Sequence, residues 1–218
     1  MVSTRLRIRF TKEGDLRLIS HRDLVRTMER MFRRAELPLT MSQGFHPKAR
    51  MTFPSALALG IAGCDEVLEI RLTGEFTSDQ VHARLAAHAP VGLQINCVEQ
   101  LSEGSPKARV EAATYQVSVP SDRLPPLQSA VTQLQSQESY IIDRGKGKKI
   151  LDLMADLQEI RLADDALIFT LRVRQEGAVR ASEVLEALDA VALLARGFPL
   201  QRTEVHLAAA KPKAEAAP

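Results

Sequence analysis

The chain opens on a strict alternation of charged and apolar residues. Arg5-Leu6-Arg7-Ile8-Arg9-Phe10 has the two-residue period of a β-strand, with its apolar residues on a core and its three arginines toward water. The spacing then changes, and apolar residues recur at helical intervals over 21–35 until Pro38 ends the pattern. Ser20 lies three residues before Asp23, as in a capping box, which predicts that this helix begins next to Ser20.

Five further segments complete the first half of the chain. Residues 16–19 predict an extended continuation of the first strand, and residues 50–60 and 65–72 predict two more strands. Residues 77–88 have helical spacing behind capping-box residues, and residues 93–101 predict a last strand. The resulting order, β-α-β-β-α-β, is that of the ferredoxin-like fold.

A polar, turn-rich stretch at 102–112 predicts a linker, after which a similar order of elements returns. The second set comprises strands at 115–119 and 140–142, a helix at 124–135, a hairpin of 157–162 and 167–173, a helix at 182–192 and a strand at 200–207. We therefore expect an α+β fold of two tandem ferredoxin-like (βαββαβ) modules, at 1–102 and 113–207. The Ala/Lys/Pro-rich residues 208–218 predict a disordered C-terminal tail.

Composition limits the classes of protein to consider. Hydrophobic residues make up 45% of the 218 residues and no apolar run approaches the roughly 20 residues of a membrane span, so we expect no membrane partner. The first residues do not resemble a secretory signal, and we expect a cytoplasmic protein. Cys64 and Cys97 lie 33 residues apart without a Cys-x-x-Cys pair, which argues against a thiolate zinc site or a self-contained iron–sulfur cluster. We expect two buried cysteines, no metal and no cofactor.

Charge is distributed unevenly along the chain. The first fifty residues hold twelve Lys/Arg against five acids, whereas the whole chain has 29 against 27. On the predicted helix, Arg22, Arg26, Arg30 and Arg33 are spaced so that they form one stripe opposite the apolar face. Such a stripe is often a plain solvated face, helped here by Glu29 beside Arg33. Guanidinium groups also suit bidentate contacts with phosphate, so the stripe is a candidate nucleic-acid contact.

A second basic cluster is Arg144-Gly145-Lys146-Gly147-Lys148-Lys149. It lacks the spacing and the Ser/Thr of a phosphate-binding Walker loop, and a solubilising hairpin loop explains it equally well. Its glycines would also let Arg144, Lys146, Lys148 and Lys149 approach a polyanion. Aromatic residues are few, so contacts to a nucleic-acid backbone fit this composition better than base stacking does.

The segment Ser42-Gln43-Gly44-Phe45-His46-Pro47 is unusual for ordinary packing. Gly44 permits a positive φ or a close approach to a ligand, and Pro47 restricts His46 to an extended conformation. The segment is either a rigid connector or a loop that contacts a target or partner, with Lys48 and Arg50 as adjacent cations. His46, with His21 and Asp23 at the start of the helix, would supply acid–base groups or metal ligands if the loop folded over the helix.

These residues also carry a resemblance. The stretch 10–24 fits the pattern K-x-G-D-L-R-x-x-S-H-x-D, residues 42–47 fit S-Q-G-F-[NH]-P, and 33–39 and 55–60 extend the match. Residues 5–72 thus resemble the radical-SAM-linked protein family, a domain of unknown function. The resemblance implies a partner, a radical SAM protein with a cobalamin-binding region, and proximity to RNA metabolism. This chain has no Cys-x-x-x-Cys-x-x-Cys motif, so a partner would supply radical chemistry.

Three functions remain open from the sequence. The first is a non-catalytic accessory module that partners a radical SAM enzyme, binds tRNA or rRNA through the basic helix and presents it for modification. The second is a protein-interaction subunit that docks on an acidic partner without RNA. The third is a metal-independent RNA-acting enzyme that uses His21 or His46, an idea that rests on analogy between folds.

Overall fold

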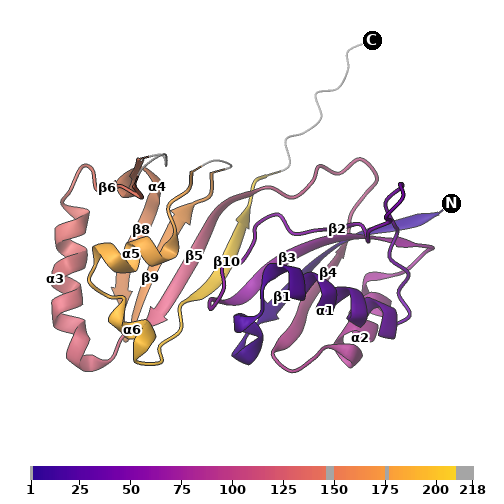
Figure 1. The fold of residues 1–218 in the computed structure, drawn as a ribbon, viewed down its shortest axis with the longest axis horizontal. Helices are drawn as coiled ribbons and strands as arrows, with labels where there is room; N and C mark the ends of the chain where they lie inside the picture. Colours follow the sequence, from indigo (N-terminus) through magenta and orange to yellow (C-terminus); the bar gives the residue numbers. More distant parts are fainter. Residues whose placement is uncertain (1, 146–149, 175–176, 210–218) are drawn as a thin grey trace, which may run out of the picture.

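The computed structural model describes residues 2–145, 150–174 and 177–209 (Figure 1). It is a mixed α+β structure whose main sheet is mostly antiparallel, in the order β4-β1-β3-β10-β5-β9-β8, with β2 also paired to β3. Strands β6 and β7 form a separate two-stranded sheet. The strands are β1 Ser3–Lys12, β2 Met51–Thr52, β3 Ala62–Thr73, β4 Leu93–Gln100, β5 Val110–Ser118, β6 Ile141–Ile142, β7 Leu151–Asp152, β8 Leu157–Ala163, β9 Ala166–Arg172 and β10 Gln201–Leu207. The helices are η1 Gly14–Leu18, α1 His21–Arg34, α2 Ser78–His88, η2 Ser121–Arg123, α3 Leu124–Gln135, α4 Leu153–Asp156, α5 Ala181–Ala187 and α6 Ala192–Ala195.

In the first half, the alternation in β1 places Leu6, Ile8 and Phe10 in a core beneath α1 and α2. Strand β1 pairs antiparallel with β3 on one side and with β4 on the other. The side chain of Ser20 accepts a hydrogen bond from the backbone N–H of Asp23 and caps α1, as the sequence predicts. Thr77 and Gln80 form a reciprocal capping box at the start of α2.

The second half has its own core. Strand β5 lies between β10 and β9, and β8 follows at the sheet edge, all of them antiparallel. Apolar residues of these strands pack against α3 and α5 in one buried cluster that includes Phe169, stacked on Tyr115 at 5.5 Å. Both halves therefore carry their helices on the same side of the sheet (Figure 1).

The two halves are joined through the sheet itself. Strand β10, the last of the chain, pairs with β5 and also runs parallel to the start of β3, where Gln201 and Arg202 lie opposite Ala62 and Gly63. A small cluster of Val67, Val110 and Val205 packs the same junction. The proposed division at 102/113 remains a prediction, because one sheet runs through both halves.

Three predicted segments differ from the structure. Residues 16–19 belong mostly to the 3-10 turn η1 rather than to an extended segment, because Gly14 takes a φ of 56° and turns the chain. Of the predicted strand 50–60, only Met51–Thr52 pairs, opposite Ile70 and Glu69, and β10 pairs farther along the same edge of β3, at Ala62 and Gly63. The predicted helix 182–192 ends near Ala187, where Asp189 has a φ of 51°, and a separate short helix follows.

Exposure also departs from the sequence in two places. The outward arginines of β1 do not simply face water, because Arg5 and Arg7 both pair with the buried carboxylate of Glu69, at 2.8 and 3.0 Å. Cys64 is half-buried and Cys97 is exposed, so the prediction of two buried cysteines is wrong. Cys97 belongs to β4, which is an edge strand of the sheet. The predicted tail, apart from its first two residues, lies outside the described residues.

Gly63 is the tightest point of the junction, and it yields a prediction about stability. A Cβ at this position would lie 2.5 Å from Cγ of Glu66, whose side chain folds back across Gly63. Gly63→Ala is expected to lower the free energy of unfolding by about 1–3 kcal/mol, because Glu66 must move. Urea unfolding measures this. The exposed strand substitution Ser118→Ala should change the value by less than about 0.5 kcal/mol, and an equally small effect of Gly63→Ala would contradict the packing described.

Candidate functional site

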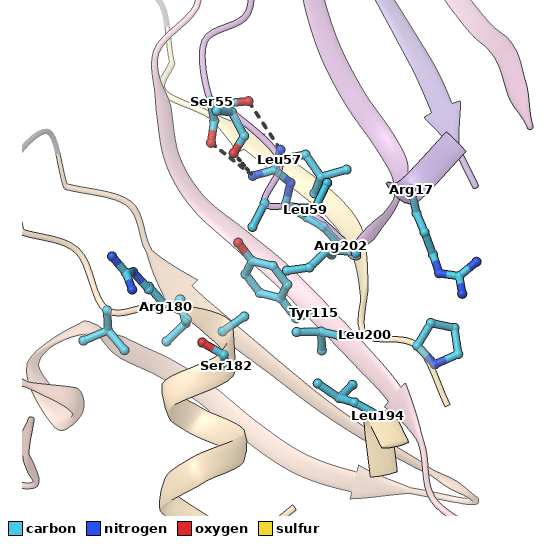
Figure 2. Close-up of a pocket in the computed structure, with 18 of the residues that line it drawn as sticks. Arg17, Ser55, Leu57, Leu59, Tyr115, Arg180, Ser182, Leu194, Leu200 and Arg202 are labelled. Atoms are coloured by element: carbon cyan, nitrogen blue, oxygen red, sulfur yellow. Dashed lines mark hydrogen bonds between the residues drawn. The ribbon is translucent and has the colours of Figure 1, made fainter. Parts of the chain in front are cut away.

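A partly enclosed pocket of about 600 Å³ lies on the helix-covered side of the sheet, where the two halves meet (Figure 2). The segment 55–61 of the first half forms one wall. Residues of β5 and β9, with the segments 178–182 and 194–200, form the opposite wall. The volume falls within the roughly 300–1,000 Å³ typical of small-molecule sites.

One residue of the lining, Arg202, belongs to a buried ion pair. Arg202 of β10 and Glu66 of β3 are 2% and 3% exposed, and the guanidinium donates to both carboxylate oxygens at 2.8 and 2.5 Å. Arg202 also donates to the hydroxyl of Ser55 at 3.1 Å, which anchors the 55–61 wall. Burial alone would lower the pKa of Arg202, but the hydrogen bonds and charge of Glu66 outweigh it and the pKa is raised. Arg202 therefore stays charged.

Lys12 brings a third charge to this junction. The residue is 1% exposed, and its ammonium group donates to the carbonyl of Ile19 at 3.3 Å. Burial lowers the pKa of Lys12, the charge of Arg202 adds to this, and Glu66 opposes it. Strands β1, β3 and β10 thus meet at two cations and one carboxylate, and in this arrangement Glu66 neutralises Arg202 most directly.

The predicted stripe on α1 lies on the outer face of the helix. Leu24, Met28, Met31 and Phe32 are buried beneath it, while Arg22, Arg26, Arg30 and Arg33 are all exposed. Arg26 pairs with Asp23 at 3.4 Å, and both side chains are more than half exposed. This is the one ion pair on α1 among the described residues, so the expected Glu29–Arg33 pair does not form.

The Gly-Phe-His-Pro segment is an excursion from the sheet edge. Leu39 lies opposite Leu72 of β3, the chain leaves the sheet, and it returns with Met51 opposite Ile70. Hydrogen bonds between residues 42 and 48 close the excursion, with the N–H of Ser42 donating to the Lys48 carbonyl at 2.7 Å. Gly44 has a φ of 128°, as its freedom allows. Phe45 is fully exposed at the tip, with Gln43, His46 and Pro47 exposed beside it.

The three candidate catalytic residues each have different surroundings. His21 packs edge-on against Phe53, with ring centroids 5.0 Å apart. Asp23 accepts a hydrogen bond from the hydroxyl of Ser20, which lowers its pKa and suits a cap better than a base. His46 is exposed on the excursion. Within residues 2–145, 150–174 and 177–209, no three His, Cys, Asp or Glu side chains form a metal-ligand set.

The other cations predicted to contact nucleic acid lie in different surroundings. The side chain of Arg144 is occupied by Glu183, at 2.6 and 2.7 Å, and by the carbonyl of Ala178. Lys146, Lys148 and Lys149 lie outside the described residues. Lys48 and Arg50 are placed on the excursion and at its return to the sheet, and Arg50 borders a shallow basic groove with Arg5, Arg71 and Lys107. In the part of the chain that the structure describes, no helix is long and apolar enough to cross a membrane.

Sequence reasoning missed the junction charges, although a signal for two of them was present. Lys12 continues the inward positions of Leu6, Ile8 and Phe10 in β1. Glu66 is the register partner of Phe10, and so it also points to the core side of the sheet. A charged residue at an inward strand position predicts a buried partner. The partner, Arg202, lies 136 residues away from Glu66 and has no local signal.

Comparison with known proteins places the chain in a family. A family described as "Uncharacterized protein conserved in bacteria (DUF2344)" matches residues 5–181, and the chain therefore belongs to it. The expectation of a domain of unknown function is confirmed, while its link to radical SAM proteins stays a prediction. The search of curated proteins found no match.

Two solved structures are similar at low scores. A crystal structure of an unknown protein from Galdieria sulphuraria has 12% identity and a TM-score of 0.29, over 95% of this chain and 100% of the other. A crystal structure described as a "putative glycine cleavage system transcriptional repressor" has 9% identity and a TM-score of 0.25, over 95% and 99%. Scores this low carry no argument about this chain.

The ion pair at the junction leads to a second prediction. Glu66→Gln is expected to lower the free energy of unfolding by about 3–5 kcal/mol, because it leaves the buried Arg202 without a counter-charge. Replacing both residues by apolar ones of similar size, Glu66→Leu with Arg202→Met, should restore most of that loss. Urea unfolding of the two variants and the parent protein tests this. A double variant less stable than Glu66→Gln would contradict the role of Glu66 as the counter-charge of Arg202.

Proposed function

We propose that this protein is a non-catalytic accessory module that binds RNA through the arginine stripe of α1. The stripe consists of Arg22, Arg26, Arg30 and Arg33. The observation that carries the proposal is that four exposed guanidinium groups share one helix face, with a single weak ion pair among them in the described structure. Four like charges on one face repel one another, and a polyanion relieves that repulsion. The buried opposite face holds α1 rigidly against the sheet.

The same proposal includes a partner. The motifs at 10–24 and 42–47 resemble those of radical-SAM-linked proteins, so the module would present its RNA to a radical SAM enzyme with a cobalamin-binding region. The excursion that carries Phe45 supports a contact of this kind. Its tip projects an aromatic side chain that takes no part in the core, and aromatic side chains are enriched at the centres of protein interfaces.

We also propose that the two halves are tandem ferredoxin-like modules. The strand order β4-β1-β3-β2 in the first half corresponds to β10-β5-β9-β8 in the second, and neighbouring strands in each set are antiparallel. In each set the first and second strands, and the third and fourth, are separated along the chain by helices. These matching orders support a repeat, with the short β2 as its weakest member.

A protein-interaction subunit that works without RNA is the second candidate. The fully exposed Phe45 favours it, because an aromatic ring in water at the tip of a structured excursion is typical of a protein-contact surface. The two candidate functions differ in whether α1 gives the protein an affinity for RNA. The first requires RNA affinity that depends on the stripe, and the second does not.

RNA binding across a salt series tests the proposal. Parent protein should bind small RNA at near-physiological salt, with log K falling linearly against log[salt] as counterions are released. Replacing Arg22, Arg26 and Arg30 together by Gln removes three phosphate contacts and should reduce the slope by about two units for single-stranded RNA. Fluorescence anisotropy with labelled RNA gives the affinity at each salt concentration.

A matched triple variant controls for net charge. Arg109, Arg161 and Arg196 are exposed in the second half of the chain, and replacing them by Gln makes the same change in charge. Their loss should leave the salt slope close to that of the parent. Equal slopes for both triple variants, or no RNA binding by the parent, would refute a specific role of the stripe and leave the protein-interaction candidate.

A further inference from the structure

The junction pocket has a chemistry that the proposed RNA contact does not use. We infer that it binds a small organic anion with an apolar body, held at the apolar end by leucines of the rim and at the charged end by Arg180. This inference concerns a different face from the outer stripe of α1 and stands independently of RNA binding. It rests on two properties of the lining: where exposed leucines gather, and which charges are present.

The apolar property is a cluster of exposed leucines. In the described part of the chain, the three most exposed leucines are Leu18, Leu59 and Leu194, at 56%, 66% and 39%, and all three line this pocket. Single exposed leucines need no explanation, but a group around one concave site marks a place where an apolar ligand gains contact area. The buried walls continue the same surface inward, through Leu57, Leu171 and Leu200.

The second property is the charge of the lining, which contains arginines and, among the described residues, no carboxylate. Arg17, Arg172, Arg180 and Arg202 border the pocket. Glu66 neutralises Arg202 from behind, whereas no carboxylate of the described residues forms an ion pair with Arg17 or Arg180. The pocket therefore keeps a net positive charge, and a negatively charged ligand fits it.

Two polar side chains of the lining, Arg180 and Ser182, lie on one side of the pocket, and Arg17 lies on the opposite side (Figure 2). Figure 2 shows Tyr115 in the middle of the pocket, with Arg180 and Ser182 on the α5 side and Leu57 and Leu59 on the side of the 55–61 wall. A charge-assisted bond from Arg180, with the hydroxyl of Ser182 on the same side, would hold an acidic head group. The leucines would cover the body of the same molecule. A volume of about 600 Å³ and partial enclosure suit a small molecule rather than a polymer.

A matched pair of dyes tests the inference on the full chain. Anilinonaphthalene sulfonate combines an apolar body with an anionic group, and N-phenylnaphthylamine is its uncharged counterpart. We expect saturable fluorescence enhancement of the sulfonate dye, one site per chain, and a rise in the apparent unfolding temperature with dye concentration. Arg180→Gln should lower the affinity for the sulfonate dye about tenfold and leave the affinity for the uncharged dye nearly unchanged.

Two further variants separate the apolar and charged contributions. Leu59→Ser removes an exposed rim leucine and should lower the affinities for both dyes by a similar factor. Arg161→Gln alters an exposed arginine that does not line the pocket and should weaken neither dye. The triple Gln variant of the α1 stripe should also bind both dyes as the parent does, so that loss of RNA binding and loss of dye binding are distinguishable.

Several results would overturn the inference. They are an absence of saturable binding, a fall in the unfolding temperature with the sulfonate dye, and equal binding of both dyes in the parent and in Arg180→Gln. The last result would show an apolar site without selection for an anion, as a docking groove for a protein segment would be.

Discussion

The Arg202–Glu66 pair is the interaction on which the arrangement of the two halves depends. It joins the last strand of the chain to the third, fixes β10 parallel to the start of β3, and holds the 55–61 wall through Ser55. A buried pair of this kind adds little net stability over an apolar replacement, yet breaking one partner is costly. Its contribution is therefore to specify register: a shift of β10 by one residue would turn the guanidinium to the other face of the sheet.

The same pair has a consequence for folding. Arg202 and Glu66 are 136 residues apart, and β10 pairs with β3 and with β5, which both precede it in the chain. The loop that closes between them is long, and contacts of such separation are slow to form. Each half has its own apolar core, and β10 is the strand that pairs with both halves.

Local patterns predicted the elements well where the residues that decide them are neighbours. The alternation of β1, the caps of α1 and α2, and the boundaries of α3 all follow from side chains within one or two turns. The prediction of an α+β structure is confirmed. Of the strand predicted at 50–60, only Met51–Thr52 pairs, and β10, from the far end of the chain, pairs farther along the same edge of β3. No local pattern contains that information. The candidate site was harder to predict, because the pocket is lined mainly by leucines and alanines, with a tyrosine, two serines and four arginines. Residues of these common types become a site only when the two halves meet. Lys12 and Glu66 were visible as charged residues at inward positions, which marks the junction but not the cavity beside it.

The excursion that carries Phe45 leaves β3 at Leu72 and rejoins it at Ile70, so its two ends are neighbours on the sheet. Movement at its tip is therefore confined by the hydrogen bonds at its base. Residues at the tip can be exchanged, and the loop can be lengthened or shortened there, without changing the register of any strand. The sheet thus serves this loop as an anchorage that does not depend on what the loop contacts, so a change of target would leave the core of the molecule untouched.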